Sequence, residues 1–344
     1  MGVMSKVAAV LAALLLVAIF VLLRDGEHII PHGEGTVKLE EGEFEAFPLP
    51  DYVAAVVSDA YKSYFIEVEP GIKIHVLEVG QGYPVYLQHG NPTTGLLYRK
   101  VVESLPLDRV RVIMPTMVGL GFSTKIPASE HTLDNHMHWM KKLLTMLDLT
   151  EAIYVGQDWG GPVGMGALSL SPGVLKGAVV MNTGFSAPRV PIDLSRAHAL
   201  VKTPLVGEFV VEVMSSFFFQ RLRRVQGDPT TMPPDVLDLY RRPLQDSGNA
   251  KATLALMRMV PDGPDHASAP ALRDIEHYVT GLDIPVELVW GMNDPILAKA
   301  LPVMQELFPA APVTETEAGH FLQEEVPEAI AAAIMRLMDA VQTK

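Results

Sequence analysis

The side chain with the clearest chemical use is Asp158, which lies in the segment Val155-Gly156-Gln157-Asp158-Trp159-Gly160-Gly161. This segment has the small-x-nucleophile-x-small pattern of a sharp strand-to-helix turn, but a carboxylate stands where other such turns carry serine. A serine alkoxide suits attack on acyl carbon, whereas a carboxylate can displace a leaving group from saturated carbon. Water then regenerates the carboxylate by attacking the resulting ester. The segment therefore predicts covalent catalysis by Asp158.

Three further polar groups follow short apolar runs. Asn91 comes after residues 85–87, Asp294 comes after residues 286–289, and His320 follows the last predicted strand. In open α/β sheets, ligands bind beyond the carboxyl ends of the strands. We therefore expect these side chains to share one site with Asp158.

The elements that position these residues are predicted to form a mainly parallel sheet. Ile72, Ile74 and Val76 alternate with polar neighbours, which predicts an antiparallel strand at the start of the domain. Apolar runs separated by helix-length segments are typical of an α/β fold with helices on both faces of the sheet. The runs occupy residues 85–87, 111–114, 153–155, 178–180 and 286–289.

Residues 185–281 carry no strand signal. Helical patterns at residues 205–222 and 250–259 predict an inserted helical cap, or lid, over the strand ends. The alternative interpretation is a set of peripheral helices that cover the sheet. The α/β core would then comprise residues 61–184 and 282–344.

The amino-terminal stretch from Val7 to Leu23 is apolar without interruption. At helical rise it is long enough to cross a hydrocarbon core of about 30 Å, and no small-x-small cleavage site follows it. Residues 1–24 therefore predict an uncleaved transmembrane anchor in the lipid bilayer. A cleaved signal peptide is the alternative.

Charges beside this stretch predict its orientation. Lys6 favours a cytoplasmic amino terminus, and thus a membrane-anchored catalytic domain on the extracytoplasmic side, although Arg24 opposes that orientation. Residues 25–60 contain scattered glycines and an acidic run, and they predict a linker and lead-in to the domain.

Composition limits the class of protein. The chain has 344 residues, of which 49% are hydrophobic and 19% charged, which is enough for one large domain with an insertion. Its net charge of -13 argues against a nucleic-acid partner, because phosphate binding needs clustered lysine and arginine. The absence of cysteine excludes a disulfide, a thiol nucleophile and a cysteine metal site. The oligomeric state stays open.

Five motifs occur in the order found in haloalkane dehalogenases of the α/β-hydrolase fold, and the chain resembles this family over roughly residues 61–338. The motifs are His89-Gly90-Asn91-Pro92-Thr93, Gly119-Leu120-Gly121-Phe122-Ser123, Gln157-Asp158-Trp159-Gly160-Gly161, Asn293-Asp294-Pro295 and Gly319-His320-Phe321-Leu322-Gln323-Glu324.

This resemblance implies a catalytic triad. Asp158 would be the nucleophile, His320 the base that activates water, and Asp294 the acid that orients His320. Some family members place this acid after the sixth strand, but here that strand ends Met181-Asn182-Thr183-Gly184 without a carboxylate. The alternative interpretation of Asp294 is a turn residue before proline. The resemblance implies neither a metal nor an organic cofactor.

The resemblance also implies a halide site. The amide of Asn91 and the indole N–H of Trp159 would hold the departing halide, and the backbone N–H groups of the same two residues would form an oxyanion hole. Because residues 185–281 contain no tryptophan, the subgroup with a lid tryptophan is excluded, and the pattern resembles the third subgroup. The implied substrates are a small halogenated hydrocarbon and water. A turn residue before Pro92 is the alternative for Asn91.

Two other functions compete with dehalogenation. An epoxide hydrolase shares the Asp-His-Asp logic but activates the ring oxygen with lid tyrosines, for which Tyr240 and Tyr278 are candidates. A catalytically weak, membrane-tethered binding protein of the same fold is the second alternative. It is suggested by Ser123-Thr124-Lys125, which departs from the Ser-Asp found at this point in relatives.

Overall fold

A computed structural model of the protein describes residues 19–20, 23–248 and 250–343. A single ten-stranded sheet runs through these residues in the order β1-β2-β3-β4-β6-β5-β7-β8-β9-β10. Its six later strands are parallel to one another, which confirms the predicted α/β architecture. They are β5 (Tyr83–Gln88), β6 (Val110–Pro115), β7 (Ala152–Gln157), β8 (Leu175–Met181), β9 (Val286–Gly291) and β10 (Val313–Thr316).

The antiparallel part of the sheet is larger than the sequence predicted. It contains β1 (Thr36–Leu39), β2 (Gly42–Ala46), β3 (Lys62–Glu69) and β4 (Ile72–Gly80). The first two strands lie within residues 25–60, the segment predicted to be a linker. Phe44 alternates with the charged Glu43 and Glu45, and its ring packs 5.4 Å from that of Tyr64. This short period-2 pattern is typical of a strand with one face against the core.

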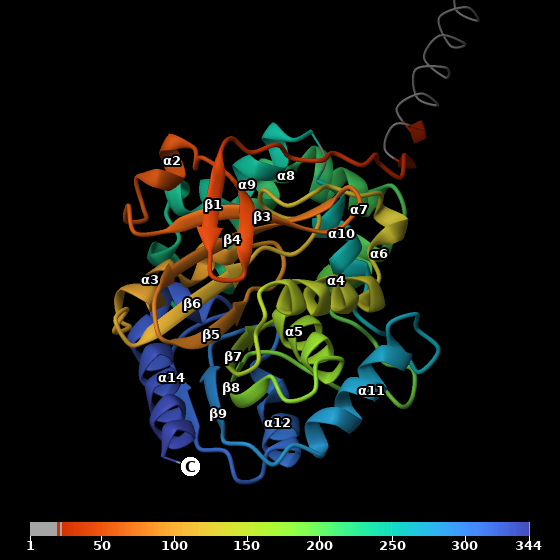
Figure 1. Cartoon of the computed structure of the whole chain (residues 1–344). Helices are drawn as coiled ribbons and strands as arrows, with labels where there is room; N and C mark the ends of the chain where they lie inside the picture. The colour runs from red at the N-terminus through yellow and green to blue at the C-terminus, as the bar shows by residue number, and fades with distance from the viewer. Residues whose placement is uncertain (1–18, 21–22, 249, 344) are drawn as a thin grey trace, which may run out of the picture.

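Helices cover both faces of the sheet, as predicted (Figure 1). On one face α3 (Arg99–Glu103) packs with α14 (Pro327–Gln342), and on the other α4 (Leu133–Met146) packs with α5 (Gly160–Ser169). The start of α4 is fixed by Thr132, whose side chain accepts a hydrogen bond from the backbone N–H of Asn135 at 3.1 Å.

Between β8 and β9 the described residues form helices and no strand. The helices α6 to α10 lie together in the upper part of Figure 1, whereas α11 (Ala269–Thr280) packs against α5 of the core. The cap limits at residues 185–281 stay a prediction. The other helices of this insertion are α6 (Arg196–Lys202), α7 (Val206–Glu208), η3 (Phe209–Val213), α8 (Ser215–Arg221), η4 (Leu222–Val225), η5 (Pro229–Thr231), α9 (Pro234–Asp246) and α10 (Lys251–Arg258).

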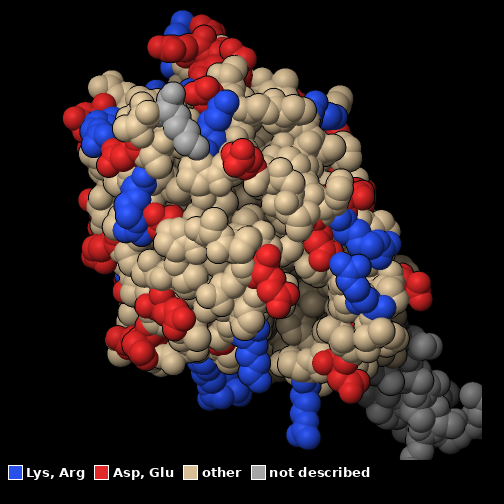
Figure 2. Space-filling model, turned by 90° about the horizontal axis from the view of Figure 1, so that it is seen from below, with Lys and Arg blue, Asp and Glu red and all other residues tan. Residues whose placement is uncertain are grey.

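Short elements complete the described chain. They are α2 (Asp51–Ala54), η1 (Gly95–Tyr98), η2 (Ala128–Glu130), η6 (Ala298–Ala300), α12 (Leu301–Leu307) and α13 (Leu322–Glu325). On the face of the molecule in Figure 2, acidic and basic side chains are interspersed and no large basic patch gathers. A surface that binds nucleic-acid phosphates needs clustered lysine and arginine, and this face has no such cluster.

The prediction of a transmembrane anchor and of a membrane-anchored, extracytoplasmic location is contradicted. Within residues 19–20, 23–248 and 250–343, no helix combines the length and apolar character needed to cross a bilayer. The longest described helix, α14, has 16 residues and carries Glu328, Arg336 and Asp339, whereas a span needs about 20 mainly apolar residues. The predicted lipid contact, from Val7 to Leu23, falls largely outside the described residues.

A buried ion pair of the core also accepts a hydrogen bond from the insertion. The two terminal guanidinium nitrogens of Arg99 on α3 donate to the carboxylate of Glu324, at 2.5 and 2.9 Å. The hydroxyl of Tyr240 on α9 donates to the same carboxylate at 2.7 Å, and Lys100 lies 3.1 Å from it. Arg99 and Glu324 are almost completely buried. Because charges this deep depend on their partners, the network should contribute strongly to stability.

We therefore expect Arg99→Met to lower the free energy of unfolding by about 3–5 kcal/mol, because it leaves the Glu324 carboxylate buried with too few donors. Urea unfolding would measure the loss. A matched control is Arg109→Met, which removes an exposed ion pair with Asp339. This control should cost less than about 1 kcal/mol. Equal losses in the two variants would contradict the argument.

Candidate active site

Asp158 lies on the sharp turn between β7 and α5, with a backbone φ of +52°. Non-glycine residues rarely adopt this left-handed conformation, so the surrounding backbone must pack closely enough to hold it. Glycine at two neighbouring positions permits this close packing of the backbone. A Cβ atom at Gly90 would lie 2.4 Å from Cβ of Asp158, and one at Gly160 would lie 2.1 Å from the carbonyl oxygen of Gln88. The predicted nucleophile thus occupies a strained turn that presents its carboxylate beyond the strand end.

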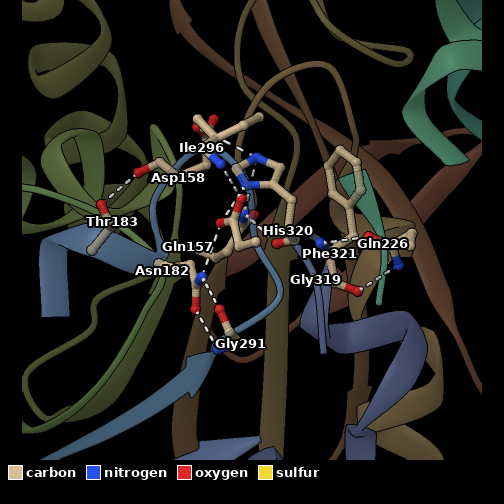
Figure 3. Close-up of polar contacts among 12 residues, drawn as sticks. Gln157, Asp158, Asn182, Thr183, Gln226, Gly291, Ile296, Gly319, His320 and Phe321 are labelled. Atoms are coloured by element: carbon tan, nitrogen blue, oxygen red, sulfur yellow. Dashed lines mark hydrogen bonds and ion pairs between the residues drawn. The ribbon is translucent and has the colours of Figure 1, made fainter. Parts of the chain in front are cut away.

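The structure places His320 beside this carboxylate (Figure 3), and Asp294 contacts the other ring nitrogen of His320. Nδ1 of His320 lies 2.9 Å from Oδ2 of Asp294, and Nε2 lies 3.7 Å from Oδ2 of Asp158. An ionised carboxylate can only accept a hydrogen bond, so the proton of neutral His320 belongs on Nδ1. Nε2 then keeps its lone pair on the side of Asp158, where it can take a proton from a water molecule.

Burial, nearby charges and hydrogen bonds together shift the pKa values of the three triad residues. Burial alone would lower the pKa of His320, but the negative charge of Asp294, their hydrogen bond and the charge of Asp158 together raise it. Burial opposes ionisation of Asp294 as well, yet the nearby His320 and three hydrogen bonds hold the pKa of Asp294 below its ordinary value. For Asp158, burial dominates and raises the pKa, although His320 and the backbone N–H groups of Trp159 and Asn91 oppose this.

These directions predict how the hydrolysis step depends on pH. Because a base must be unprotonated, hydrolysis of an ester at Asp158 should accelerate as pH rises through the pKa of His320. Esterification removes the charge of Asp158, which is one cause of the raised pKa of His320. The midpoint for ester hydrolysis should therefore lie below the pKa of His320 in the free protein. Single-turnover rates and NMR titration of the imidazole would measure the two values, and identical values would contradict this account.

Hydrogen-bond donors surround the carboxylate. The backbone N–H of Asn91 donates to Oδ1 of Asp158 at 2.8 Å. The side-chain amide of Asn91 donates to the carbonyl oxygen of Thr253 on α10 at 3.0 Å, a contact that the sequence did not suggest. Trp159 is 7% exposed, and no residue in the described part of the chain accepts a hydrogen bond from its indole N–H. This indole N–H therefore keeps its donor free for a ligand.

Sequence reasoning missed the residues that orient the triad. Nδ2 of Asn182 donates to Oδ2 of Asp294 at 2.8 Å, and Thr183 donates to the carbonyl oxygen of Asp158 at 2.7 Å. Gln157 donates to the carbonyl oxygen of His320 at 2.9 Å (Figure 3). The usable signal was position, because Asn182 directly follows β8 at the carboxyl edge of the sheet.

The insertion contributes more groups to the same region. Val225 accepts a hydrogen bond from the backbone N–H of His320 at 2.8 Å, and Gln226 accepts one from Phe321 at 2.9 Å. Burial lowers the pKa of His198 on α6, while the negative charge of Asp158 opposes the shift. The end of η4 and the residue after it therefore help to hold the loop of His320, and α6 lies within electrostatic reach of the Asp158 carboxylate.

The two tyrosines considered as epoxide activators have other surroundings. The hydroxyl of Tyr240 is committed to Glu324, and Tyr278 lies on α11, the helix that packs against α5. A cavity of about 500 Å³ also borders α10, but its lining includes Lys251, Leu254 and Arg258 and none of the five predicted site residues. It is therefore distinct from the triad.

The chain is similar to known proteins in both sequence and structure. A family described as alpha/beta hydrolase fold matches residues 83–327. Haloalkane dehalogenase 2 of Mycobacterium tuberculosis is 29% identical over 270 residues, covering 76% of this chain and 90% of that protein. A cis-3-alkyl-4-alkyloxetan-2-one decarboxylase of Shewanella oneidensis is 30% identical over 292 residues, covering 82% and 90%.

Structural similarity agrees with these matches. The crystal structure of a mutant haloalkane dehalogenase from Agrobacterium tumefaciens superposes with a TM-score of 0.72 at 27% identity. The superposition covers 84% of this chain and 99% of that one.

Proposed function

The chain belongs to the alpha/beta hydrolase fold family, and from this premise we propose that it cleaves carbon–halogen bonds of haloalkanes through an ester at Asp158. The observation that carries this proposal is the arrangement around the carboxylate. Asp158 stands on the strand-to-helix turn with His320 beside it, and Asp294 is hydrogen-bonded to the far side of His320. A nucleophile, a base and an orienting acid are therefore within reach of one another.

The proposed cycle begins with displacement at saturated carbon. An oxygen of Asp158 forms a bond to the carbon as the carbon–halogen bond breaks, and the halide leaves with the bonding electrons. The indole N–H of Trp159 and the amide of Asn91 stabilise the negative charge that develops on the halide. The first step thus yields an alkyl ester of Asp158 and a halide ion.

Hydrolysis completes the cycle. His320 takes a proton from water, and the resulting hydroxide attacks the carbonyl carbon of the Asp158 ester. The backbone N–H groups of Asn91 and Trp159 are positioned to stabilise the oxyanion, since the former already donates to Oδ1. The bond between the acyl carbon of Asp158 and the oxygen that carries the alkyl group then breaks. The alcohol departs with a proton from His320.

A second candidate is cleavage of an oxetan-2-one, a strained four-membered lactone. It is favoured by the relative named as a cis-3-alkyl-4-alkyloxetan-2-one decarboxylase, which matches 82% of the chain at 30% identity. Epoxide opening receives less support, because the hydroxyl of Tyr240 is bonded to Glu324.

Parallel assays separate these functions. The purified protein would be given bromo- and iodoalkanes, styrene oxide and a cis-3,4-dialkyloxetan-2-one, with halide, diol and carbon dioxide measured in turn. We expect halide release from primary bromoalkanes. Release of carbon dioxide without any halide would assign the second candidate instead.

A further inference from the structure

The cap reaches the proposed leaving-group site through α10. The carbonyl oxygen of Thr253 accepts the side-chain amide of Asn91 at 3.0 Å, and Thr253 is 1% exposed. The neighbouring Ala252 is equally close to the core, because a Cβ atom at Gly119 would lie 2.7 Å from Cβ of Ala252. Helix α10 therefore contacts the loops that follow β5 and β6 directly.

This contact fixes which way the Asn91 amide faces. A backbone carbonyl can only accept, so Nδ2 and not Oδ1 of Asn91 must point at Thr253. One of the two N–H groups of Nδ2 is then used, and one is left for a departing anion. If the amide turned over, it would present Oδ1, a partial negative charge, to that anion.

Two buried polar atoms beside this contact lack partners. They are Oδ1 of Asn91 and Oγ1 of Thr253, and neither has a hydrogen bond within the residues that the structure describes. The two atoms are complementary, since a hydroxyl donates and an amide oxygen accepts. They also belong to residues that are already hydrogen-bonded to each other. Rotation about the Cα–Cβ bond of Thr253 redirects the hydroxyl without moving α10.

We propose that Thr253 is a positioning residue that clamps Asn91 at two points, with its carbonyl accepting from Nδ2 and its hydroxyl donating to Oδ1. The clamp keeps the free N–H of Asn91 directed at the leaving group. It rests on the proposed function in that the leaving group is a halide. Since Thr253 acts through Asn91, it influences formation of the ester and not its hydrolysis by His320.

The test uses Thr253→Val, which removes the hydroxyl at nearly constant volume, and Thr253→Ser, which restores it. We expect Thr253→Val to weaken bromide binding, followed by tryptophan fluorescence, and to slow ester formation, each by about threefold to tenfold, as for a lost hydrogen bond between neutral groups. Ester hydrolysis should change less than about twofold, in keeping with the small effect of an interaction absent from that step. Thr253→Ser should recover most of both losses.

The controls separate positioning from structure. Thr203→Val, at an exposed threonine of the same insertion, should behave as wild type. The clamp is overturned if Thr253→Val binds bromide and forms the ester as wild type does, or if it slows ester formation and hydrolysis equally. It is also overturned if Thr253→Ser fails to recover the losses.

Failure of the proposed function would look different, because wild type itself would then release no halide. The clamp stays testable in that case through the side-chain amide protons of Asn91, assigned by their loss in Asn91→Asp. The clamp predicts that these protons exchange with solvent more slowly in wild type than in Thr253→Val, and equal rates would refute it.

Discussion

Replacement of Asp158 by alanine should reduce halide release by about 10⁴-fold or more, because the covalent route loses its nucleophile. The turn itself should survive, since the strained backbone is held by close contacts at Gly90 and Gly160 and alanine keeps the Cβ atom. Initial rates of halide release would measure the effect. Asp193→Ala, at an exposed carboxylate of the insertion, is the matched control and should retain wild-type rates. Retained activity in Asp158→Ala would exclude the ester mechanism.

Heavy-oxygen water distinguishes an ester from direct attack by water in the wild-type protein. In the ester mechanism, water adds to the carbonyl carbon of Asp158, so the first alcohol carries an oxygen that came from the carboxylate. One heavy oxygen then remains in Asp158 and appears in the alcohol of later turnovers. Peptide mass spectrometry after a single turnover would locate the label. Label in the first alcohol and none in the carboxylate would indicate direct displacement by water.

The parallel sheet could be predicted from the sequence because its strands are buried on both faces. Val85, Ile153, Val179 and Leu288 lie in continuous apolar runs, and all four are fully buried in the structure. The proximity of the predicted triad follows from the same property, since the carboxyl ends of parallel strands meet at one edge of the sheet. Residues as far apart in the chain as Asp158 and His320 could therefore be expected together.

The segment that carries β1 and β2 is harder to predict from the sequence, because its signal depends on a partner strand. Glu43 and Glu45 indicated a solvated linker, but they flank Phe44, which packs against the core through Tyr64. Half-buried antiparallel strands carry only a few apolar residues, so composition alone resembles that of a linker. The local sequence alone does not specify a strand here, and hydrogen-bonded pairing with β3 stabilises it.

The residues that orient the site escaped prediction for a related reason. In the sequence Asn182 stands out only as a position without a carboxylate, yet its amide donates to Asp294. Thr253 gave no signal at all, because its contact with Asn91 runs through a backbone carbonyl and spans 162 positions of the chain. Contacts of this kind depend on how the insertion folds back, which neither hydrophobic periodicity nor motif spacing encodes.

Replacement of His320 by phenylalanine should trap the ester. The aromatic ring preserves most of the volume beside Phe321, whose ring lies 4.8 Å away, but it cannot accept a proton from water. Ester hydrolysis should slow by about 10²–10⁴-fold, the usual contribution of a general base. With 1,2-dibromoethane, we expect a burst of about one bromide per protein molecule, as a single blocked turnover requires. Intact mass spectrometry should show the gain of one bromoethyl group.

The pH of the trapping experiment follows from the electrostatics of the site, and control variants test the assignment to Asp158 and His320. Because His320 opposes the burial that raises the pKa of Asp158, its removal leaves the nucleophile harder to ionise, so trapping belongs at mildly alkaline pH. His277→Phe, at an exposed histidine of α11, should turn over normally. The double variant Asp158→Ala/His320→Phe should form no adduct, which assigns the bond to Asp158. Continuous bromide release by His320→Phe without an adduct would mean that another group activates water.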